Sequence, residues 1–156
     1  MIKDKIRSDL TKALKNRETL KVSTLRMMLA EIVNKEKEKG ESVVDETAVK
    51  IFYTMIKMRE EAAGHYKDAG REDAAQKEKE EIVIIKSYLP PQLGEEEIRE
   101  EAKKVIAEVG AHDLKGLGKV MGVLSKRLSG KASGKEMSRI VKEEIEKLQQ
   151  KVNDHP

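Results

Sequence analysis

The chain has 156 residues, of which 38% are hydrophobic and 39% are charged, and its net charge at pH 7 is +3. Ordinary soluble domains carry about 25% charged residues, and this near balance of signs does not by itself indicate nucleic-acid binding. Because cysteine is absent, a disulfide framework, a thiolate metal site and a cysteine nucleophile are excluded. No apolar run approaches the ~20 residues that span a bilayer, and the first residues lack the apolar core of a signal peptide. We therefore expect no membrane association and a cytoplasmic location.

The fold class predicted from the composition is all-α, because strong helix formers dominate and apolar residues recur at spacings of three and four. Four amphipathic helices are predicted in the first part of the chain, over residues 2–15, 19–39, 46–69 and 72–89. Asp45 is the expected N-cap of the third helix and Gly70 its expected C-cap. The run Ile82-Val83-Ile84-Ile85 resembles a strand, but the helical charge pattern before it favours a helix.

The domain boundary is predicted at two successive prolines, Pro90 and Pro91. Pro90 disfavours helix at the residue before it, and the pair removes two backbone donors. The predicted organisation is an N-terminal domain of about four helices, a linker, a small three-helix domain and a frayed tail, over residues 1–89, 90–94, 95–150 and 151–156.

Three helices are predicted after the linker. The first begins with Glu95-Glu96-Glu97, where the helix dipole favours carboxylates, and it ends at Gly110. Asp113 is the expected cap of the second helix. Ser133 and Glu136 fit a capping box at the start of the third.

The charge of this second part is uneven. Residues 94–114 hold seven acidic and three basic side chains, whereas residues 115–139 hold seven basic side chains and one acidic. The basic residues are Lys115, Lys119, Lys126, Arg127, Lys131, Lys135 and Arg139. Six of the ten glycines fall between positions 110 and 134. Glycine admits a close backbone and Lys and Arg neutralise phosphate, so the segment predicts a sugar-phosphate binding surface.

A purely structural explanation of the same segment stays open. Gly118 and Gly122, four residues apart, would let two helices pack closely. Gly130 and Gly134 would form a helix stop and a tight turn, and the lysines would be a solvated face. The segment lacks the P-loop pattern and the strand that precedes a P-loop.

Four motifs occur here in a fixed order along the chain. They are Leu89-Pro90-Pro91-Gln92-Leu93, Glu95-Glu96-Glu97-Ile98, Leu117-Gly118-Lys119-Val120-Met121-Gly122 and Gly130-Lys131-Ala132-Ser133-Gly134-Lys135. With these motifs the chain resembles the GatB/YqeY family over nearly all of residues 1–150, and it looks like a free-standing YqeY-like protein.

The resemblance implies that the C-terminal domain is similar to the tail of the B subunit of tRNA-dependent glutamine amidotransferases. In those enzymes the tail contacts tRNA and catalysis happens elsewhere. The residues that match the tail motif are Gly118, Lys119, Met121, Gly122, Gly130, Lys131, Gly134 and Lys135. The family usually has Asp at the position of Ser133, which puts a carboxylate-specific role there in doubt.

No catalytic or metal-binding constellation is predicted. His65 lies one helical turn after Glu61, a spacing typical of a surface pair as well as of a metal site or a general base. His112 beside Asp113 fits a helix start, and no His-Glu-x-x-His pattern is present. Three consecutive carboxylates, such as those at 95–97, point in different directions and do not converge on one ion. We therefore expect no cofactor, no metal and no catalytic residue.

The favoured function is a non-catalytic tRNA-binding accessory module that recognises phosphate and shape, with tRNA or another structured RNA as the partner. The predicted RNA-binding residues are Lys115, Gly118, Lys119, Gly122, Lys126, Arg127, Gly130, Lys131, Gly134, Lys135 and Arg139.

Two alternative functions follow. In the first alternative, the chain is an adaptor that docks its N-terminal helices onto an amidotransferase or another translation protein. In that case Met27, Met28, Met55 and Met58 would line an adaptable groove, whereas otherwise they fill the core. The other alternative is carbon–nitrogen ligase activity with glutamine as amido donor, which only the family resemblance suggests. We expect no such activity, because neither a nucleotide site nor an ammonia source is evident.

Overall fold

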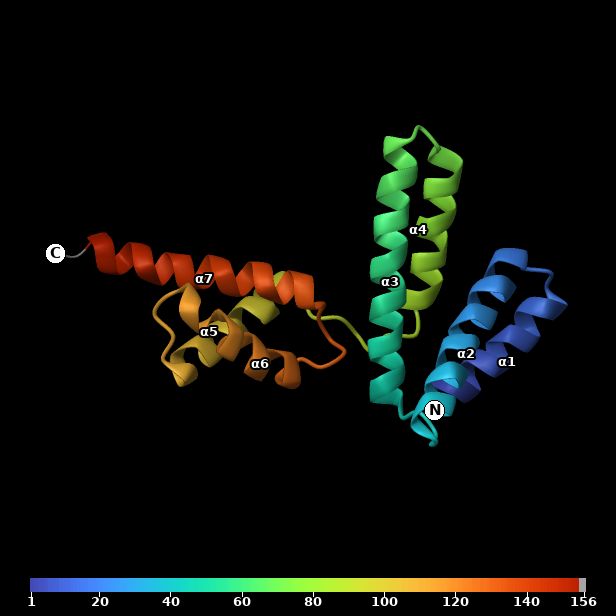
Figure 1. Cartoon of the computed structure of the whole chain (residues 1–156), viewed down its shortest axis with the longest axis horizontal. Helices are drawn as coiled ribbons and strands as arrows, with labels where there is room; N and C mark the ends of the chain where they lie inside the picture. The colour runs from blue at the N-terminus through green and yellow to red at the C-terminus, as the bar shows by residue number, and fades with distance from the viewer. Residues whose placement is uncertain (155–156) are drawn as a thin grey trace. The chain divides into compact units, whose positions relative to one another are not determined.

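The computed structural model describes residues 1–154, and in that range the chain is all-α, as the sequence predicts (Figure 1). The described residues form seven α-helices and one short 3-10 helix, without a strand. By their internal contacts they divide into two compact units, Met1–Leu89 (unit 1) and Pro90–Pro156 (unit 2). No helix in the described range has the length and apolar character needed to cross a membrane.

Unit 1 consists of two helical hairpins (Figure 1). Its helices are α1 (Ile2–Lys15), α2 (Thr19–Lys39), α3 (Asp45–Asp68) and α4 (Glu72–Lys86). Helix α1 packs along α2, α3 packs along α4, and α2 also contacts α3 and α4. The apolar stripes of all four helices meet in one core. Its fully buried members include Ile6, Leu25, Met28, Ile32, Phe52 and Ile85.

The apolar run in α4 is helical, as predicted. Ile82 and Ile85 point into the core, whereas Val83 is exposed. The helix ends at Lys86 rather than at the predicted Leu89. Among the four methionines of α2 and α3 that the sequence singled out, Met28 and Met55 are buried and fill the core. Met27 and Met58 are exposed.

Three polar contacts fasten α1 to the rest of unit 1. The backbone N–H of Ile2 donates to Asp45 Oδ1 at 3.0 Å. Lys3 Nζ lies 2.5 Å from Glu36 Oε1. The prediction that Asp45 caps its own helix is wrong, because the N-cap of α3 is Val44. The Asp45 carboxylate instead accepts the hydrogen bond from the amide of Ile2, the first helical residue of α1.

Tyr88, which follows α4, makes the third contact. Its hydroxyl donates to Asp9 Oδ2 at 2.5 Å, and Lys5 Nζ lies 5.3 Å from the centre of its ring. Burial and the negative charge of Asp9 together raise the pKa of the Tyr88 hydroxyl well above its ordinary value.

The turn between α1 and α2 contains a residue in an unfavourable backbone conformation. Arg17 has φ = 56°, and it is the one non-glycine residue with positive φ in the described chain. The amide of Glu18 donates to the carbonyl of Ala13 at 3.0 Å and that of Arg17 to Leu14 at 3.3 Å. This pattern closes a helix with a left-handed residue, a position that glycine usually occupies. The same position after α2 and α5 is Gly40 and Gly110.

Unit 2 consists of three helices and a short 3-10 turn. Its elements are α5 (Glu95–Val109), the 3-10 helix η1 (Leu114–Gly116), α6 (Leu117–Arg127) and α7 (Gly134–Asp154). All three α-helices contact one another. Ile98, Val105, Val120, Leu124 and Ile145 are fully buried between them.

Two predicted boundaries in unit 2 are corrected by the structure. Asp113 caps η1, where its Oδ1 accepts from the amide of Lys115 at 3.0 Å, and α6 begins only after that turn. Helix α7 continues to Asp154, so residues 151–154 are helical rather than a frayed tail, and residues 155–156 lie outside the described range.

Arg99 ties α5 to α7. Its guanidinium contacts Glu144 at 2.6 Å, Glu143 at 2.9 Å and Glu95 at 2.9 Å. The side chain of Glu144 is only 7% exposed, so Arg99 provides the counter-charge for a buried carboxylate. Burial raises the pKa of Glu144, but the bonds from Arg99 and Lys147 outweigh that effect and lower it overall.

We expect Arg17→Gly to raise the free energy of unfolding by about 0.5–1 kcal/mol, because glycine adopts the left-handed conformation without the steric cost that arginine carries. Chemical denaturation followed by circular dichroism measures the change. Arg26→Gly is the matched control: Arg26 lies exposed within α2, where glycine should lower stability by about 1 kcal/mol. A loss of stability in Arg17→Gly would contradict this account of the turn.

We expect Arg99→Met to lower the stability of unit 2 by about 2 kcal/mol at pH 7, because it leaves the buried Glu144 short of its main partner. The folded-state pKa of Glu144 is depressed, so the stabilisation is present above the unfolded pKa of about 4.3 and is lost as pH falls through the folded pKa. The difference between variant and parent should therefore shrink below roughly pH 4. Lys104→Met, an exposed change on α5, should show neither effect. A deficit that persists unchanged into acid would contradict the carboxylate explanation.

Candidate nucleic-acid interface

The predicted glycine and lysine residues of α6 lie on the face of that helix opposite the core. Val120 and Leu124 are fully buried, whereas Gly118, Lys119 and Gly122 are exposed. Ser125 and Lys126 are exposed as well. At about 100° per residue, these five positions span an arc of about 120° with Gly122 near its centre. We call them the α6 face.

The glycines of the α6 face have no packing role within the described residues. A Cβ atom built at Gly118 or at Gly122 would meet no atom within 4 Å. The alternative prediction, that these two glycines let helices pack closely, is therefore wrong. Gly116, which the sequence did not single out, is instead closely packed: a Cβ there would lie 2.7 Å from Cβ of Ala111, in the loop that follows α5.

The loop between α6 and α7 is shaped by Gly130 and by the linker. Gly130 has φ = 77°, which supports its predicted role as a helix stop. The linker amide of Leu93 donates to the carbonyl of Lys131 at 2.9 Å, and Gln92 Nε2 donates to the carbonyl of Gly130 at 2.9 Å. Sequence reasoning assigned Gln92 and Leu93 to a linker and missed this bracing, because no local pattern pairs residues about 40 positions apart.

The start of α7 follows the predicted capping arrangement. The amide of Glu136 donates to Oγ of Ser133 at 3.1 Å, so serine caps the helix here where the family usually has Asp. Gly134 and Lys135 form the first exposed turn, and a Cβ at Gly134 would meet no atom within 4 Å.

The basic residues of the segment differ in their partners. Arg127 pairs with Glu108 of α5, and Arg139 contacts Glu143 at 3.0 Å and Glu95 at 3.2 Å. These carboxylates raise the pKa of both guanidinium groups and balance their charge locally. The two arginines are thus less available to an outside anion than the sequence implied.

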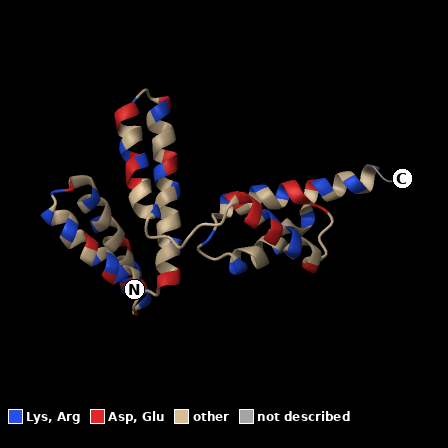
Figure 2. Ribbon diagram, turned by 180° about the vertical axis from the view of Figure 1, so that it is seen from behind, with Lys and Arg blue, Asp and Glu red and all other residues tan. Residues whose placement is uncertain are grey.

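Five lysines carry the uncompensated charge of the segment. None of them has an ion-pair partner among the described residues, and all five are exposed. They come from η1, the α6 face, the following loop and the start of α7, and they are Lys115, Lys119, Lys126, Lys131 and Lys135. Apart from Asp113, which caps η1, the acidic residues of unit 2 lie on α5 and α7, whereas α6 carries none (Figure 2).

In the described part of the chain, no group of three or more His, Asp or Glu side chains is placed to hold a metal ion. The Glu61–His65 spacing noted from the sequence lies on exposed positions of α3.

Residues 3–145 match the protein-family model described as Yqey-like protein. Several curated relatives bear the name "Altered inheritance of mitochondria protein 41, mitochondrial". The one from Vanderwaltozyma polyspora is 35% identical over 85 residues, which is 54% of this chain and 46% of the relative. The one from Clavispora lusitaniae is 31% identical over 110 residues, 69% of this chain and 64% of the relative. A third, from Pyrenophora tritici-repentis, is 25% identical over 134 residues, 85% of this chain and 74% of the relative.

These relatives bear on two points. The chain spans less than two thirds of the length of the first two. The expected cytoplasmic location is also contradicted, because all three relatives are named as mitochondrial proteins. Composition could not reveal this, since a location is not a property of the folded domain.

The family match covers both units and includes the proline linker and both glycine motifs quoted above. The chain therefore belongs to the YqeY-like family.

Proposed function

We propose that unit 2 binds the sugar-phosphate backbone of a structured RNA, with tRNA as the favoured partner, and that the protein acts as a non-catalytic accessory module. The observation that carries the proposal is the α6 face, where Gly118 and Gly122 stand in open space beside Lys119 and Lys126.

The glycines of the α6 face are costly to the helix. Gly122 lies in the interior of α6, where a glycine lowers helix stability by about 1 kcal/mol relative to alanine, and no packing within the described chain offsets the loss. Without a Cβ, the backbone of α6 can be approached closely by a bulky partner. Lysines on the same face supply the charge that a phosphate partner requires.

The composition of unit 2 favours recognition of phosphate and shape rather than of bases. The Phe and Tyr residues of the chain all precede residue 90 and Trp is absent; the residues are Phe52, Tyr53, Tyr66 and Tyr88. Base recognition in single-stranded RNA depends on stacking against aromatic or guanidinium planes. The flexible lysine side chains suit phosphate oxygens, and the two arginines near them already have carboxylate partners.

The choice of tRNA rests on the family resemblance. The glycine motifs that match the amidotransferase tail include Gly118, Gly122, Gly130 and Gly134. Lys119, Lys131 and Lys135, which belong to the same motifs, carry the uncompensated charge. The proposal includes no bond-forming step.

A second candidate function is that of an adaptor that docks unit 1 onto an amidotransferase or another translation protein. It is favoured by the exposed side chains of Met27 and Met58, the latter 63% exposed. Methionine is common on surfaces that accept helices of varied sequence.

We expect Gly122→Ala to stabilise α6 by up to about 1 kcal/mol and at the same time to weaken tRNA binding several-fold, because the added methyl group projects from the centre of the α6 face. Filter binding of tRNA to the full chain, together with thermal denaturation, measures both effects. Gly64→Ala is the matched control, since Gly64 lies in α3 and a Cβ there also meets open space. That variant should gain stability and keep its affinity. Unchanged tRNA affinity in Gly122→Ala would remove the main support for the proposal.

We expect the double variant Lys119→Ala/Lys131→Ala to bind tRNA at least about tenfold more weakly at low salt and to lower the slope of log K against log salt by about 2. The reason is the loss of two phosphate contacts. Titrations at several salt concentrations give the slope. Lys77→Ala/Lys79→Ala, two exposed lysines on α4, is the charge-matched control and should leave the slope unaltered. Equal slopes for the two variants would mean that binding follows net charge alone.

A further inference from the structure

The C-terminal half of α7 exposes a continuation of its own core stripe. Val141 and Ile145 are fully buried between α7 and its neighbours. The same stripe continues at Leu148, which is 39% exposed, and at Val152, which is 73% exposed. Steps of three and four residues keep these side chains on one face of the helix. The apolar face of α7 therefore continues past the helices that cover it.

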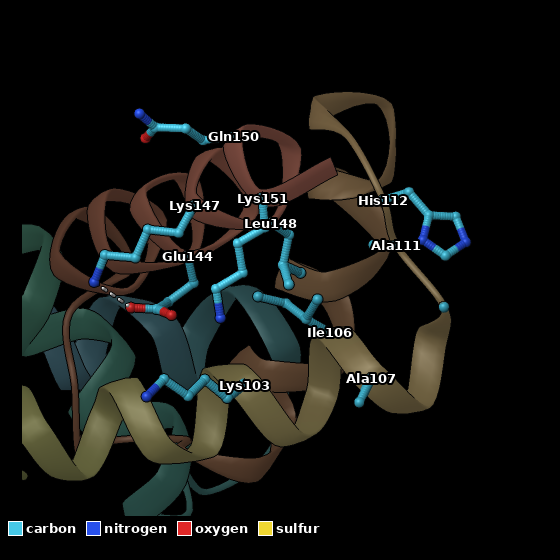
Figure 3. A pocket seen from close by; sticks show the side chains of 11 residues that line it. Lys103, Ile106, Ala107, Ala111, His112, Glu144, Lys147, Leu148, Gln150 and Lys151 are labelled. Carbon is cyan, nitrogen blue, oxygen red and sulfur yellow. Dashed lines mark hydrogen bonds and ion pairs between the residues drawn. The ribbon is translucent and has the colours of Figure 1, made fainter. Parts of the chain in front are cut away.

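This exposed stripe borders a groove. One hollow of about 800 Å³ lies between the last turns of α5 and α7 and the short segment 110–112 (Figure 3). Its apolar lining includes Ile106, Ala107, Ala111 and Leu148. A second hollow of about 440 Å³ shares His112, Leu148 and Lys151 with the first and adds Val152. Because the two hollows share three residues, they are neighbours, and we refer to them together as the α5–α7 groove.

The rim of the α5–α7 groove is basic. Lys103, Lys147 and Lys151 lie around the same hollow, with Ile106 and Leu148 beside Lys151 (Figure 3). The acidic residue in the lining is Glu144, whose charge is balanced by Arg99 at 2.6 Å and by Lys147 at 3.1 Å. Lys103 also lies 3.6 Å from Glu100, whereas Lys151 has no ion-pair partner among the described residues. The groove thus combines an aliphatic floor with a rim whose uncompensated charge is that of Lys151.

We propose that the α5–α7 groove docks an amphipathic helix of a protein partner, with leucine-like residues on one face and acidic residues beside them. The aliphatic floor suits a helix that presents apolar anchors on one face every three to four residues. The acidic flank follows from Lys151, which has no ion-pair partner among the described residues, and from Lys103, whose contact with Glu100 is long at 3.6 Å and exposed to solvent. A second copy of this chain fits poorly, because its own α7 would bring Lys147 and Lys151 against the same lysines.

The α5–α7 groove differs from the α6 face in chemistry. The α6 face offers bare backbone and lysines, whereas the groove offers Leu148, Val152 and Ile106 between lysines. No lysine belongs to both surfaces. Binding of a helix in the α5–α7 groove can therefore be tested independently of RNA binding at the α6 face.

The test uses the full chain and two designed helical peptides of about five turns, each carrying a fluorophore. The acidic peptide has leucines on one face and glutamates beside them, and its twin has lysines in place of the glutamates. Fluorescence anisotropy should show binding of the acidic peptide and at least tenfold weaker binding of the twin. Absence of binding by the acidic peptide, or equal binding of both, would overturn the proposal.

Variants locate the binding. Leu148→Ser/Val152→Ser should weaken binding of the acidic peptide at least tenfold, and because both side chains are exposed the fold should persist, which circular dichroism checks. Val83→Ser removes an equally exposed apolar side chain from unit 1 and should leave binding unaltered. Wild-type affinity in the double serine variant would refute docking at this site.

Charge exchange tests the rim. The double variant Lys103→Glu/Lys151→Glu should no longer bind the acidic peptide and should gain affinity for its basic twin. These two lysines are chosen because neither contacts the buried Glu144. The same variant should bind tRNA as before. If it instead lost tRNA affinity and kept the acidic peptide, the rim would be an RNA surface and the docking proposal would be wrong.

Discussion

The buried carboxylate of Glu144 is the constraint on which the arrangement of unit 2 depends. A charge in that position requires a partner, and Arg99 reaches it at 2.6 Å from the neighbouring helix. The same guanidinium lies 2.9 Å from Glu95 and 2.9 Å from Glu143, and Arg139 contacts both of these carboxylates as well. The network therefore fixes α5 against α7 and balances much of the acidic charge at their contact.

This network also decides which basic residues remain available. The sequence contains an acidic stretch followed by a basic one, and counting charges assigns all seven basic residues to a single surface. In the folded unit, Arg139 and Arg127 turn back to carboxylates of α5 and α7. The lysines do not, and a point charge on a flexible stem suits phosphate oxygens better than it suits a fixed bidentate pair.

The sequence predicted the helices well because their determinants are local. Periodic apolar residues, Gly110 and the Ser133 cap act within a few positions of the helices that they define. The capping role predicted for Asp45 was wrong because its carboxylate accepts a hydrogen bond from the amide of Ile2, a residue 43 positions away. Gln92 and Arg99 were missed for the same reason: their partners are near in space but distant in sequence.

The glycines show how far a motif can be interpreted without coordinates. Four glycines in a basic segment fitted both a packing role and a binding role, and spacing alone could not separate them. The space around three of them does so: a Cβ atom at Gly118, Gly122 or Gly134 would meet no atom within 4 Å, whereas one at the neighbouring Gly116 would lie 2.7 Å from Cβ of Ala111. A helix-weakening residue with no neighbour has no benefit inside the isolated chain, and this directs attention to something outside it.

Unit 2 thus presents lysines in two different settings. On the α6 face they flank exposed backbone, where there is no apolar side chain to bury and where a charged, bulky backbone such as that of RNA can approach. Around the α5–α7 groove they flank Leu148 and Val152, whose burial would favour association by roughly 25 cal/mol for each Å² of apolar surface covered. RNA phosphates cannot supply that apolar surface, but a helix with leucine-like residues can. The side chains between the lysines, rather than the lysines themselves, therefore distinguish the partner of each surface.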